Sequence, residues 1–503
     1  MGNIKNLAGQ TAIYGVSSIL GRLLNYLLVP LYSRVFLPDE AAVYVEMYAY
    51  VAFLIVLLTY GMETAFFRFN EKNGKNSPVF STILTGILFS SVIFVTAAIC
   101  LSGPISDLLR YPNNPEYIIY FALIIGLDAF TSIPFAKLRA ENRSVRFATI
   151  KLINIGVNIG LNLFLLLFVP YAYNNLSWGP DAFGMINSGE PIIGHIFVAN
   201  LAASAIVFLL LTPDFLKIRF RFDRKLWVKM FRYAFPLLIL GLAGVANEMV
   251  VDRVLIKYLL PENIAAYQLG IYGMVFKIAI AMTIFTQAFR YAAEPFFFAI
   301  EKEKNSKIVY ADVMKYFIIL MTFMFLSIML YMDIVKYFLG KEYYSGLKIV
   351  PILLYSHIFL GIFYNLSIWY KLSGQTRFGA YISILGTIIS ITLNIILIPR
   401  IGYVGSAWAN FVCYAVMMVV SYFLGQKYYH VQYDMLKIFI YMGLSAALWY
   451  ISVLFAKYVL PDQPNMQMAF NTLLLFIFIV VIFSSEPRLM LRLKSIGKNK
   501  GEE

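Results

Sequence analysis

The chain contains 503 residues, of which 60% are hydrophobic and only 14% are charged, and its formal net charge is +14. So apolar a composition over this length excludes an ordinary soluble enzyme and indicates an integral membrane protein. The two cysteines, Cys100 and Cys413, both lie in apolar segments, so the sequence offers neither a disulfide framework nor a metal-binding motif.

Fourteen apolar runs are long enough to form membrane-crossing helices, each of which needs about 20 residues. In chain order, the expected helices span residues 9–31, 41–63, 79–103, 115–136, 147–169, 191–212, 230–251, 266–289, 311–332, 345–369, 378–399, 403–426, 435–458 and 467–485. The first run is too long for the core of a signal peptide and has no small-residue cleavage pattern after it, so we expect it to remain in the mature protein. The predicted fold class is all-α and integral to the membrane, with about 14 transmembrane helices.

The distribution of Lys and Arg predicts the orientation in the membrane. When the N-terminus is placed in the cytoplasm, 30 of the 41 Lys and Arg residues fall in segments on that side and 9 on the opposite side. The positive-inside rule therefore predicts that both termini are cytoplasmic. The net positive charge follows from this asymmetry, so it predicts contact with anionic membrane lipids and no nucleic-acid partner.

Three pairs of short segments recur in the same order, which indicates an internal repeat of six helices. The pairs, with offsets of 223, 234 and 232 residues, are FLPDEAAVY (36–44) with LLPENIAAY (259–267), KLRAENR (137–143) with KLSGQTR (371–377), and LNLFLLLFVP (161–170) with LNIILIP (393–399). Because six is even, both copies enter the membrane from the same side, so an axis along the membrane normal should relate them. We expect one six-helix lobe at 1–222, a second at 223–430, two further helices at 431–485 and a basic cytoplasmic tail at 486–503.

Two cations, Arg22 and Lys277, lie inside expected helices. A charge at mid-membrane costs roughly 2.5 to 3.5 kcal/mol on insertion scales, so such a residue suggests a function. A guanidinium and an ammonium that face one cavity would suit a diphosphate, which has several acceptor oxygens. Alternatively, carboxylates of other helices neutralise the two cations. The candidate partners are Asp128 and Glu46 for Arg22, and Asp252 and Glu248 for Lys277.

Other polar residues in the expected helices have two interpretations each. Asp128 could carry a coupling proton or pair with Arg22. Asparagines at 154, 158 and 162 recur every four residues and so share one helix face, which could line a cavity, although Gly156 and Gly160 equally favour close helix packing. The full set of candidate cavity-lining residues is Asn25, Asn154, Asn158, Asn162 and Asn247.

The expected cytoplasmic end of the eighth helix contains a candidate gate. Arg290 and Glu294 are four residues apart and could form a local ion pair there. No catalytic motif accompanies them, because the three histidines are isolated and no HExxH, GxSxG or P-loop pattern occurs. We therefore expect no catalytic residue, no metal and no enzymatic activity. A membrane polysaccharide polymerase or glycosyl transferase is a weaker alternative, because the long loop 171–190 contains Asp181 and Glu190 but no Arg, Lys or His.

Two segments resemble a known family. NIILIPRIGYVGSAWAN (394–410) and VDRVLIKYLLPENIAAYQLGIYG (251–273), together with the helix count and the repeat, are similar to the polysaccharide-transporter branch (O-antigen and lipid-linked oligosaccharide flippases) of the multidrug/oligosaccharidyl-lipid/polysaccharide exporter superfamily. The resemblance implies a flippase that moves a polyprenyl-diphosphate-linked oligosaccharide from the inner to the outer leaflet by alternating access. It also implies a bacterial plasma (inner) membrane location, a role in making a surface polysaccharide such as lipopolysaccharide, and polymerase or assembly proteins as partners.

The resemblance leaves two alternatives within the same superfamily. Lipid II flippases use cavity-facing cations on their first, second and eighth helices; Arg22 and Lys277 lie on matching helices, but the second helix offers only Glu46 and Glu63. A cation-coupled multidrug exporter would favour buried carboxylates over buried cations. No cofactor is expected, apart from coupling to a proton or sodium gradient or to the membrane potential.

Overall fold

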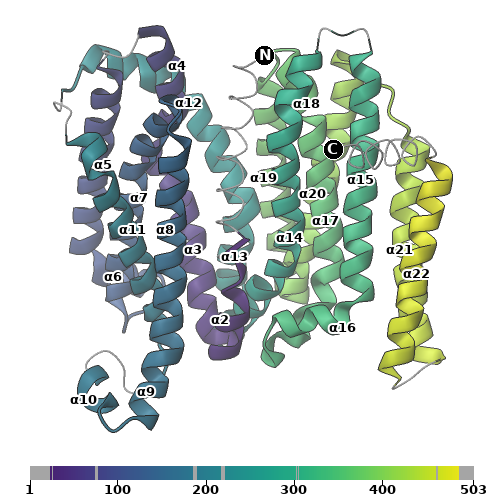
Figure 1. The fold of residues 1–503 in the computed structure, drawn as a ribbon, viewed down its shortest axis with the longest axis horizontal. Helices are drawn as coiled ribbons and strands as arrows, with labels where there is room; N and C mark the ends of the chain where they lie inside the picture. Colours follow the sequence, from purple (N-terminus) through teal and green to yellow (C-terminus); the bar gives the residue numbers. More distant parts are fainter. Residues whose placement is uncertain are drawn as a thin grey trace, which may run out of the picture. The chain divides into compact units, whose positions relative to one another are not determined.

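The structure, a computed structural model, describes residues 23–24, 26–73, 78–184, 190–216, 221–301, 303, 305–459 and 463–486; for residues 71–73, 292, 295 and 299 it describes the backbone alone. Every regular element in these ranges is a helix (Figure 1). The predicted all-α class is therefore confirmed.

Thirteen helical stretches in the described ranges are long and apolar enough to cross a membrane, and they coincide with the second to fourteenth expected helices. The first expected helix, at 9–31, lies largely outside the described residues. The thirteen are Pro38–Asn70, Val79–Cys100, Pro115–Ala140, Ser144–Asn175, Gly194–Phe215, Arg224–Leu259, Glu262–Phe298, Ser306–Leu330, Lys341–Leu372, Arg377–Ile401, Tyr403–Tyr428, Met435–Tyr458 and Pro464–Ser485. The chain is a multi-pass membrane protein.

The described helices form two compact units. The first comprises the described residues up to Lys277 together with Ser383–Ala409. Its elements are α2 (Val29–Val35), α3 (Pro38–Thr59), α4 (Met62–Asn73), α5 (Val79–Cys100), α6 (Ser102–Leu108), α7 (Pro115–Ala140), α8 (Ser144–Leu163), η1 (Phe164–Phe168), α9 (Val169–Asn175), α10 (Gly179–Phe183), α11 (Gly194–Phe215), α12 (Arg224–Val245), η2 (Ala246–Val250) and α13 (Val251–Leu259). In this unit α4 lies at one end, and α6, α9 and α10 lie at the other (Figure 1).

The second unit comprises Ile278–Ile382 and the described residues from Asn410 onward. Its elements are α15 (Ser306–Leu330), α16 (Met332–Val335), η3 (Lys336–Phe338), η4 (Lys341–Ile349), α17 (Val350–Leu366), α18 (Ile368–Leu372), α21 (Met435–Tyr458) and α22 (Pro464–Ser485). Both units contain parts of α14 (Glu262–Ile300), α19 (Arg377–Ile401) and α20 (Tyr403–Tyr428). The lobe boundaries expected at 222 and 430 remain a prediction.

Local sequence explains where α3 begins and ends. Pro38 occupies the first helical position, and the Glu40 carboxylate accepts a hydrogen bond from the backbone N–H of Leu37 at 3.0 Å. Both features satisfy the otherwise unpaired groups of a helix N-terminus. Tyr60 and Gly61, with φ of 34° and 71°, end α3 in the left-handed region before α4 begins. The second span is therefore a helix interrupted near its predicted cytoplasmic end.

Each half of the predicted repeat contains an ion pair that involves its repeated basic segment. In the first half, Arg139 of α7 pairs with Glu63 of α4. In the second half, Lys371 of α18 pairs with Glu294 of α14. The basic residues belong to the repeated KLRAENR and KLSGQTR segments, but Lys371 aligns with Lys137 and not with Arg139, so the two pairs are not formed by equivalent residues. The duplicated six-helix unit remains a prediction.

The two helices beyond the repeat are attached through polar contacts. α21 packs against both α15 and α22. Within the membrane-spanning part, the Asn471 side-chain amide donates to the carbonyl of Leu330 at 2.6 Å and accepts from the Ser452 hydroxyl at 2.6 Å. Buried amide contacts of this kind hold helices together in a lipid environment, where the hydrophobic effect contributes little.

Candidate functional site

Lys277 lies on α14, near the middle of the Glu262–Phe298 span. Its ammonium lies 5.4 Å from the centroid of the Tyr44 ring on α3, a geometry suited to a cation–π interaction. Arg253 of α13 is an electrostatic neighbour of both residues. Among the residues that the structure describes, no carboxylate forms an ion pair with Lys277. A half-buried ammonium inside a membrane span thus remains without a counter-charge in this part of the chain.

Asp252, an expected partner of Lys277, makes other contacts. Its carboxylate accepts hydrogen bonds from the hydroxyl of Tyr272 at 2.6 Å and from the side-chain amide of Asn394 at 3.2 Å. Asn394 in turn accepts from the Ser406 hydroxyl at 2.6 Å. All four residues are almost completely buried. This network joins α13, α14, α19 and α20, so its evident role is to fix these helices together.

The π-helical segment η2 precedes this network. It covers Ala246–Val250 and includes Asn247, which is buried at 4% exposure. π-Helical turns often occur at functional positions because one extra residue per turn shifts the side chains that follow. In this chain, η2 directly precedes α13, whose first turn contains Asp252 and Arg253.

Asp128 and Asn154 meet at a polar pocket inside the first unit. The pocket has a volume of about 330 Å³ and lies among α4, α7, α8 and α11. Lys151 and Ser204 also line it, and both interact with the Asp128 carboxylate. One carboxylate, one ammonium and several amide and hydroxyl groups could hold a proton or a small cation. Glu63 and Arg139, which form the ion pair described above, border the same pocket.

Glu46, an expected partner of Arg22, forms an ion pair with Lys257 of α13. The Lys257 ammonium lies 2.6 Å from the Glu46 carboxylate, and the two side chains are 8% and 0% exposed. The hydroxyls of Tyr50 and Tyr111 also donate to Glu46. Tyr111 lies in the connection between α6 and α7; burial, followed by the Glu46 carboxylate, raises its pKa well above the usual value, so its hydroxyl stays a donor.

The asparagine stripe on α8 separates into two environments. Asn154 faces the polar pocket. Asn162 is fully buried, donates to the carbonyl of Asn158 at 2.7 Å, and accepts from the Tyr32 hydroxyl of α2 at 3.0 Å. Asn158 and Asn162 thus serve helix contact. Two other predicted site residues, Arg22 and Asn25, lie outside the described residues.

The candidate gate at Arg290 and Glu294 forms within the second unit. The Arg290 guanidinium lies 3.4 Å from the Glu294 carboxylate and 4.3 Å from the Tyr364 ring centroid. Lys371 shares the same carboxylate. One acidic group therefore connects α14 with α18, which is the type of contact that a cytoplasmic gate would need.

Sequence reasoning missed Lys257 and Tyr111 as members of a buried polar group. Lys257 falls among the cations of the external segments when these are counted by sequence, because it lies only four residues before Pro261. Its spacing of four residues from Arg253 places both cations on one helix face, and this periodicity could have indicated that Lys257 points inward. Tyr111 lies in a loop, where no sequence periodicity indicates which side chains are buried.

Among the described residues, no group of three or more His, Cys, Asp or Glu side chains could hold a metal ion. The polar groups within the spans instead form hydrogen-bonded contacts and one pocket of mixed charge.

Several solved transporter structures share the fold of this chain. A lipid II flippase in an inward closed conformation (MurJ) aligns with a TM-score of 0.72 at 13% identity, covering 94% of this chain and 99% of that chain. An inward-facing multidrug-resistance MATE transporter aligns with a TM-score of 0.63 at 15% identity, covering 81% and 94%. The MATE multidrug transporter DinF-BH gives a TM-score of 0.61 at 18% identity, covering 84% and 95%. These likenesses show a shared fold.

Sequence comparison gives the family. None of the curated proteins matches the chain by sequence. A family model described as polysaccharide biosynthesis protein matches residues 7–301, which is more than half of the chain. The chain therefore belongs to the polysaccharide biosynthesis protein family, and its fold is that of the multidrug/oligosaccharidyl-lipid/polysaccharide exporter superfamily.

Proposed function

We propose that this protein is a flippase that moves a polyprenyl-diphosphate-linked oligosaccharide from the inner to the outer leaflet by alternating access. The observation that carries the proposal is Lys277, an ammonium within a membrane span that forms no ion pair with a carboxylate of the described residues. The family match and the fold shared with a lipid II flippase support the same class of substrate.

Moving the headgroup across the membrane has a large electrostatic cost. A diphosphate carries at least two negative charges, and transfer of such a group through hydrocarbon without compensation is prohibitive. A protein that moves it must supply fixed cations and polar groups along the path. Lys277 and its neighbour Arg253 provide positive charge on adjacent helices, and Arg22 is a third candidate cation on the first helix. The polyprenyl chain would stay in lipid throughout.

The pocket around Asp128 is the candidate coupling site. A carboxylate surrounded by Lys151, Asn154 and Ser204 can exchange a proton or a small cation and change its interactions when it does so. Occupation of this pocket would bias the α7–α8–α11 packing and thereby the conformation of the first unit. The coupling ion would be a proton or sodium.

The same pocket favours a second candidate, a cation-coupled exporter of small amphipathic compounds. That function needs a titratable carboxylate within a lobe, which Asp128 supplies, and it does not need a cation at Lys277. The two functions therefore differ in which of these residues transport requires. Under either function, we place the protein in a bacterial inner membrane with both termini cytoplasmic. As a flippase it would work beside the polymerase or assembly proteins that use its product.

The test compares lipids that differ only in the headgroup linkage. Purified protein in proteoliposomes would receive a fluorescent oligosaccharide linked to polyprenol through a diphosphate, or the same oligosaccharide linked without phosphate. A membrane-impermeant quencher reports headgroup translocation. We expect translocation of the diphosphate lipid above that of protein-free vesicles and none of the neutral lipid. Equal movement of both lipids, or of neither, would refute the proposal.

A further inference from the structure

A tight contact joins helices of the two predicted lobes at the predicted external end, and all of it lies within the first compact unit. α3 belongs to the first lobe, whereas α13 and the first part of α14 belong to the second. α3 packs directly against α13 and η2. We call the contacts of α3 and the α6–α7 connection with α13 and α14 the outer seam.

The polar half of the outer seam is the buried pair of Glu46 and Lys257. Besides the 2.6 Å contact with Glu46, the Lys257 ammonium donates to the carbonyl of Leu109 at 2.5 Å and lies 3.9 Å from the Tyr111 ring centroid. The pair is therefore enclosed by the α6–α7 connection as well as by α3. Arg110 adds a second, more exposed pair with Glu262, at 3.3 Å.

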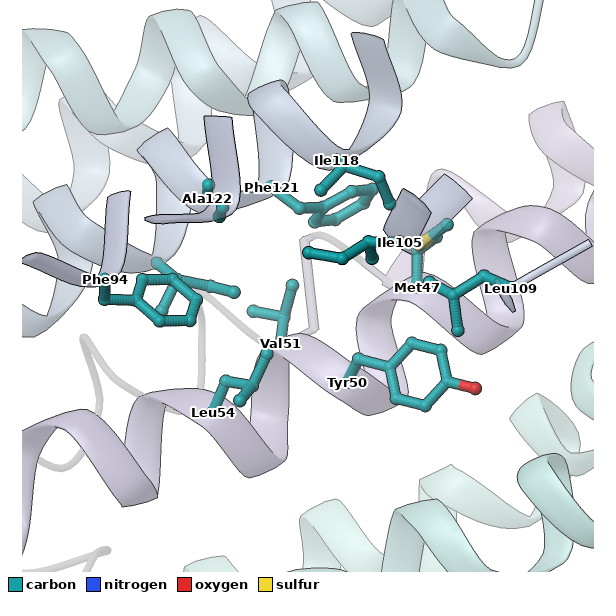
Figure 2. Close-up of a pocket in the computed structure, with 12 residues that line it drawn as sticks. Met47, Tyr50, Val51, Leu54, Phe94, Ile105, Leu109, Ile118, Phe121 and Ala122 are labelled. Carbon is teal, nitrogen blue, oxygen red and sulfur yellow. The ribbon is translucent and has the colours of Figure 1, made fainter. Parts of the chain in front are cut away.

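An apolar pocket borders the seam. It has a volume of about 250 Å³ and lies among α3, α5, α6 and α7. The Tyr50 ring forms part of its wall, and its hydroxyl points away from the other lining side chains (Figure 2). That hydroxyl donates to Glu46 at 2.7 Å. The carboxylate is thus held by donors while apolar groups surround it.

The apolar half of the seam is an approach of α14 to α3 that glycine permits. A Cβ built on Gly270 would lie 1.8 Å from the carbonyl oxygen of Pro38, and one built on Gly273 would lie 2.3 Å from the Val45 side chain. A side chain at Gly270 would require the backbone of Pro38 to move, and one at Gly273 would require the Val45 side chain to move. Ala42 lies between Pro38 and Val45 on the same helix face and is 1% exposed.

We propose that the outer seam is a reversible latch, that is, a contact that closes the transport path at its external end and separates when the path opens. The Glu46–Lys257 ion pair and the close approach at Gly270 and Gly273 hold it closed. This inference rests on the proposed alternating-access function. A buried ion pair gives little stability over an apolar pair of the same size, but its two charges are readily rehydrated when the helices separate. A glycine contact has no interlocking side chains to unpack. Both properties suit a contact that must open and close.

The test measures access to the seam without using transport. A single cysteine replaces Ala42 in a chain that carries Cys100→Ser and Cys413→Ala, and a membrane-impermeant maleimide is added from the external side of intact cells. We expect slow labelling in this background. Glu46→Gln should raise the labelling rate by about tenfold or more, because the closed state then holds an unpaired ammonium. Gly270→Ala should raise it as well, through steric exclusion from the closed state.

Matched controls separate the latch from general damage. Asp333→Asn breaks the exposed ion pair with Lys336 in the second unit, and Gly156→Ala adds a methyl group where nothing lies within 4 Å. Neither should change the labelling rate. The combined variant Glu46→Gln with Lys257→Met removes both charges and should label more slowly than Glu46→Gln alone.

The outcomes distinguish the latch from the proposed function. If Glu46→Gln and Gly270→Ala, each purified as a monodisperse folded protein, label at the unmodified rate, the latch does not exist, whatever the protein transports. If the controls label as fast as the seam variants, the access change is non-specific and the latch is also rejected. If the seam variants label faster but the protein moves no diphosphate lipid, the latch stands and the proposed substrate fails.

Discussion

Glu486, directly after α22, holds the last two helices to the rest of the second unit. Its carboxylate lies 2.7 Å from the Lys437 ammonium and 2.9 Å from that of Lys315, and it accepts from the Tyr441 hydroxyl at 3.0 Å. The Glu486 side chain is only 5% exposed. The perturbation is Glu486→Gln, which keeps the size of the side chain and removes its charge.

The expected loss follows from these contacts. A hydrogen bond to a charged group contributes about 1.5 to 3 kcal/mol, and three such bonds to one acceptor do not add in full. In the variant, Lys315 still has the Asp312 carboxylate at 3.4 Å and Lys437 still has that of Asp434 at 3.9 Å. These remaining ion pairs compensate in part for the lost charge of Glu486. We therefore expect Glu486→Gln to lower the free energy of unfolding by about 2 to 3 kcal/mol at pH 7.

The pH dependence gives a second readout. Burial alone would raise the pKa of Glu486, but the hydrogen bonds from Lys437, Lys315 and Tyr441 outweigh it and lower the pKa below the usual 4.5. A carboxylate with a lowered pKa in the folded state contributes stability that is complete above its unfolded pKa and is lost as the pH falls through the folded value. The difference between the two proteins should therefore be constant near pH 7 and shrink below about pH 4.5.

Thermal denaturation of the purified proteins in detergent, followed by circular dichroism, measures both effects. Lys457→Ala, an exposed substitution on α21, serves as the control and should leave the transition unchanged. A loss below about 0.5 kcal/mol at pH 7 would refute the reasoning. So would a difference that stays constant down to pH 3.

Three further outcomes follow from the same structure. Gly402→Ala should lower the free energy of unfolding by about 1 to 3 kcal/mol in thermal denaturation. The reason is that Gly402 has a φ of +62° and an added Cβ would lie 2.2 Å from the Gln268 carboxamide oxygen. Gly443→Ala, where an added Cβ would meet nothing within 4 Å, should not destabilise the protein. Asn394→Leu should lower the free energy of unfolding by about 1 to 3 kcal/mol in the same assay, because it removes one donor of the buried Asp252 carboxylate. An unchanged transition would exclude the network as a helix anchor. Asp128→Asn should abolish the acceleration of translocation by an imposed proton or sodium gradient, and a variant that still responds would exclude this pocket as the coupling site.

The positions of the membrane-spanning helices were the most predictable property of this chain. Thirteen of the expected helices correspond to helices of the structure, because a span of about 20 apolar residues has few alternatives in a bilayer. The internal repeat of six helices stays a prediction from the three pairs of similar segments. Periodicity likewise identified Arg290 and Glu294 as neighbours on one helix.

Partners from distant helices were not predictable in the same way. Sequence spacing placed Glu46 in the second expected helix and Asp252 just beyond the seventh, but it could not select Lys257 over Arg22 as the partner of Glu46, because Lys257 falls in an external segment by sequence. The hydrogen bonds of Asp252 with Tyr272 and Asn394 were not predictable either, because the partner of a side chain depends on how the helices rotate and cross. Local elements such as η2 also shift the side-chain register by one residue, and no sequence period signals this.

The central claim is that Lys277 binds the diphosphate of the lipid substrate. Its most direct test is headgroup translocation of the fluorescent polyprenyl-diphosphate oligosaccharide in proteoliposomes, with the intact protein, Lys277→Ala, Arg22→Ala and the control Lys457→Ala at matched insertion. We expect the intact protein and Lys457→Ala to translocate the lipid, whereas the folded Lys277→Ala protein should not. Translocation by Lys277→Ala at the rate of the intact protein would contradict this claim and make Lys277 a structural cation.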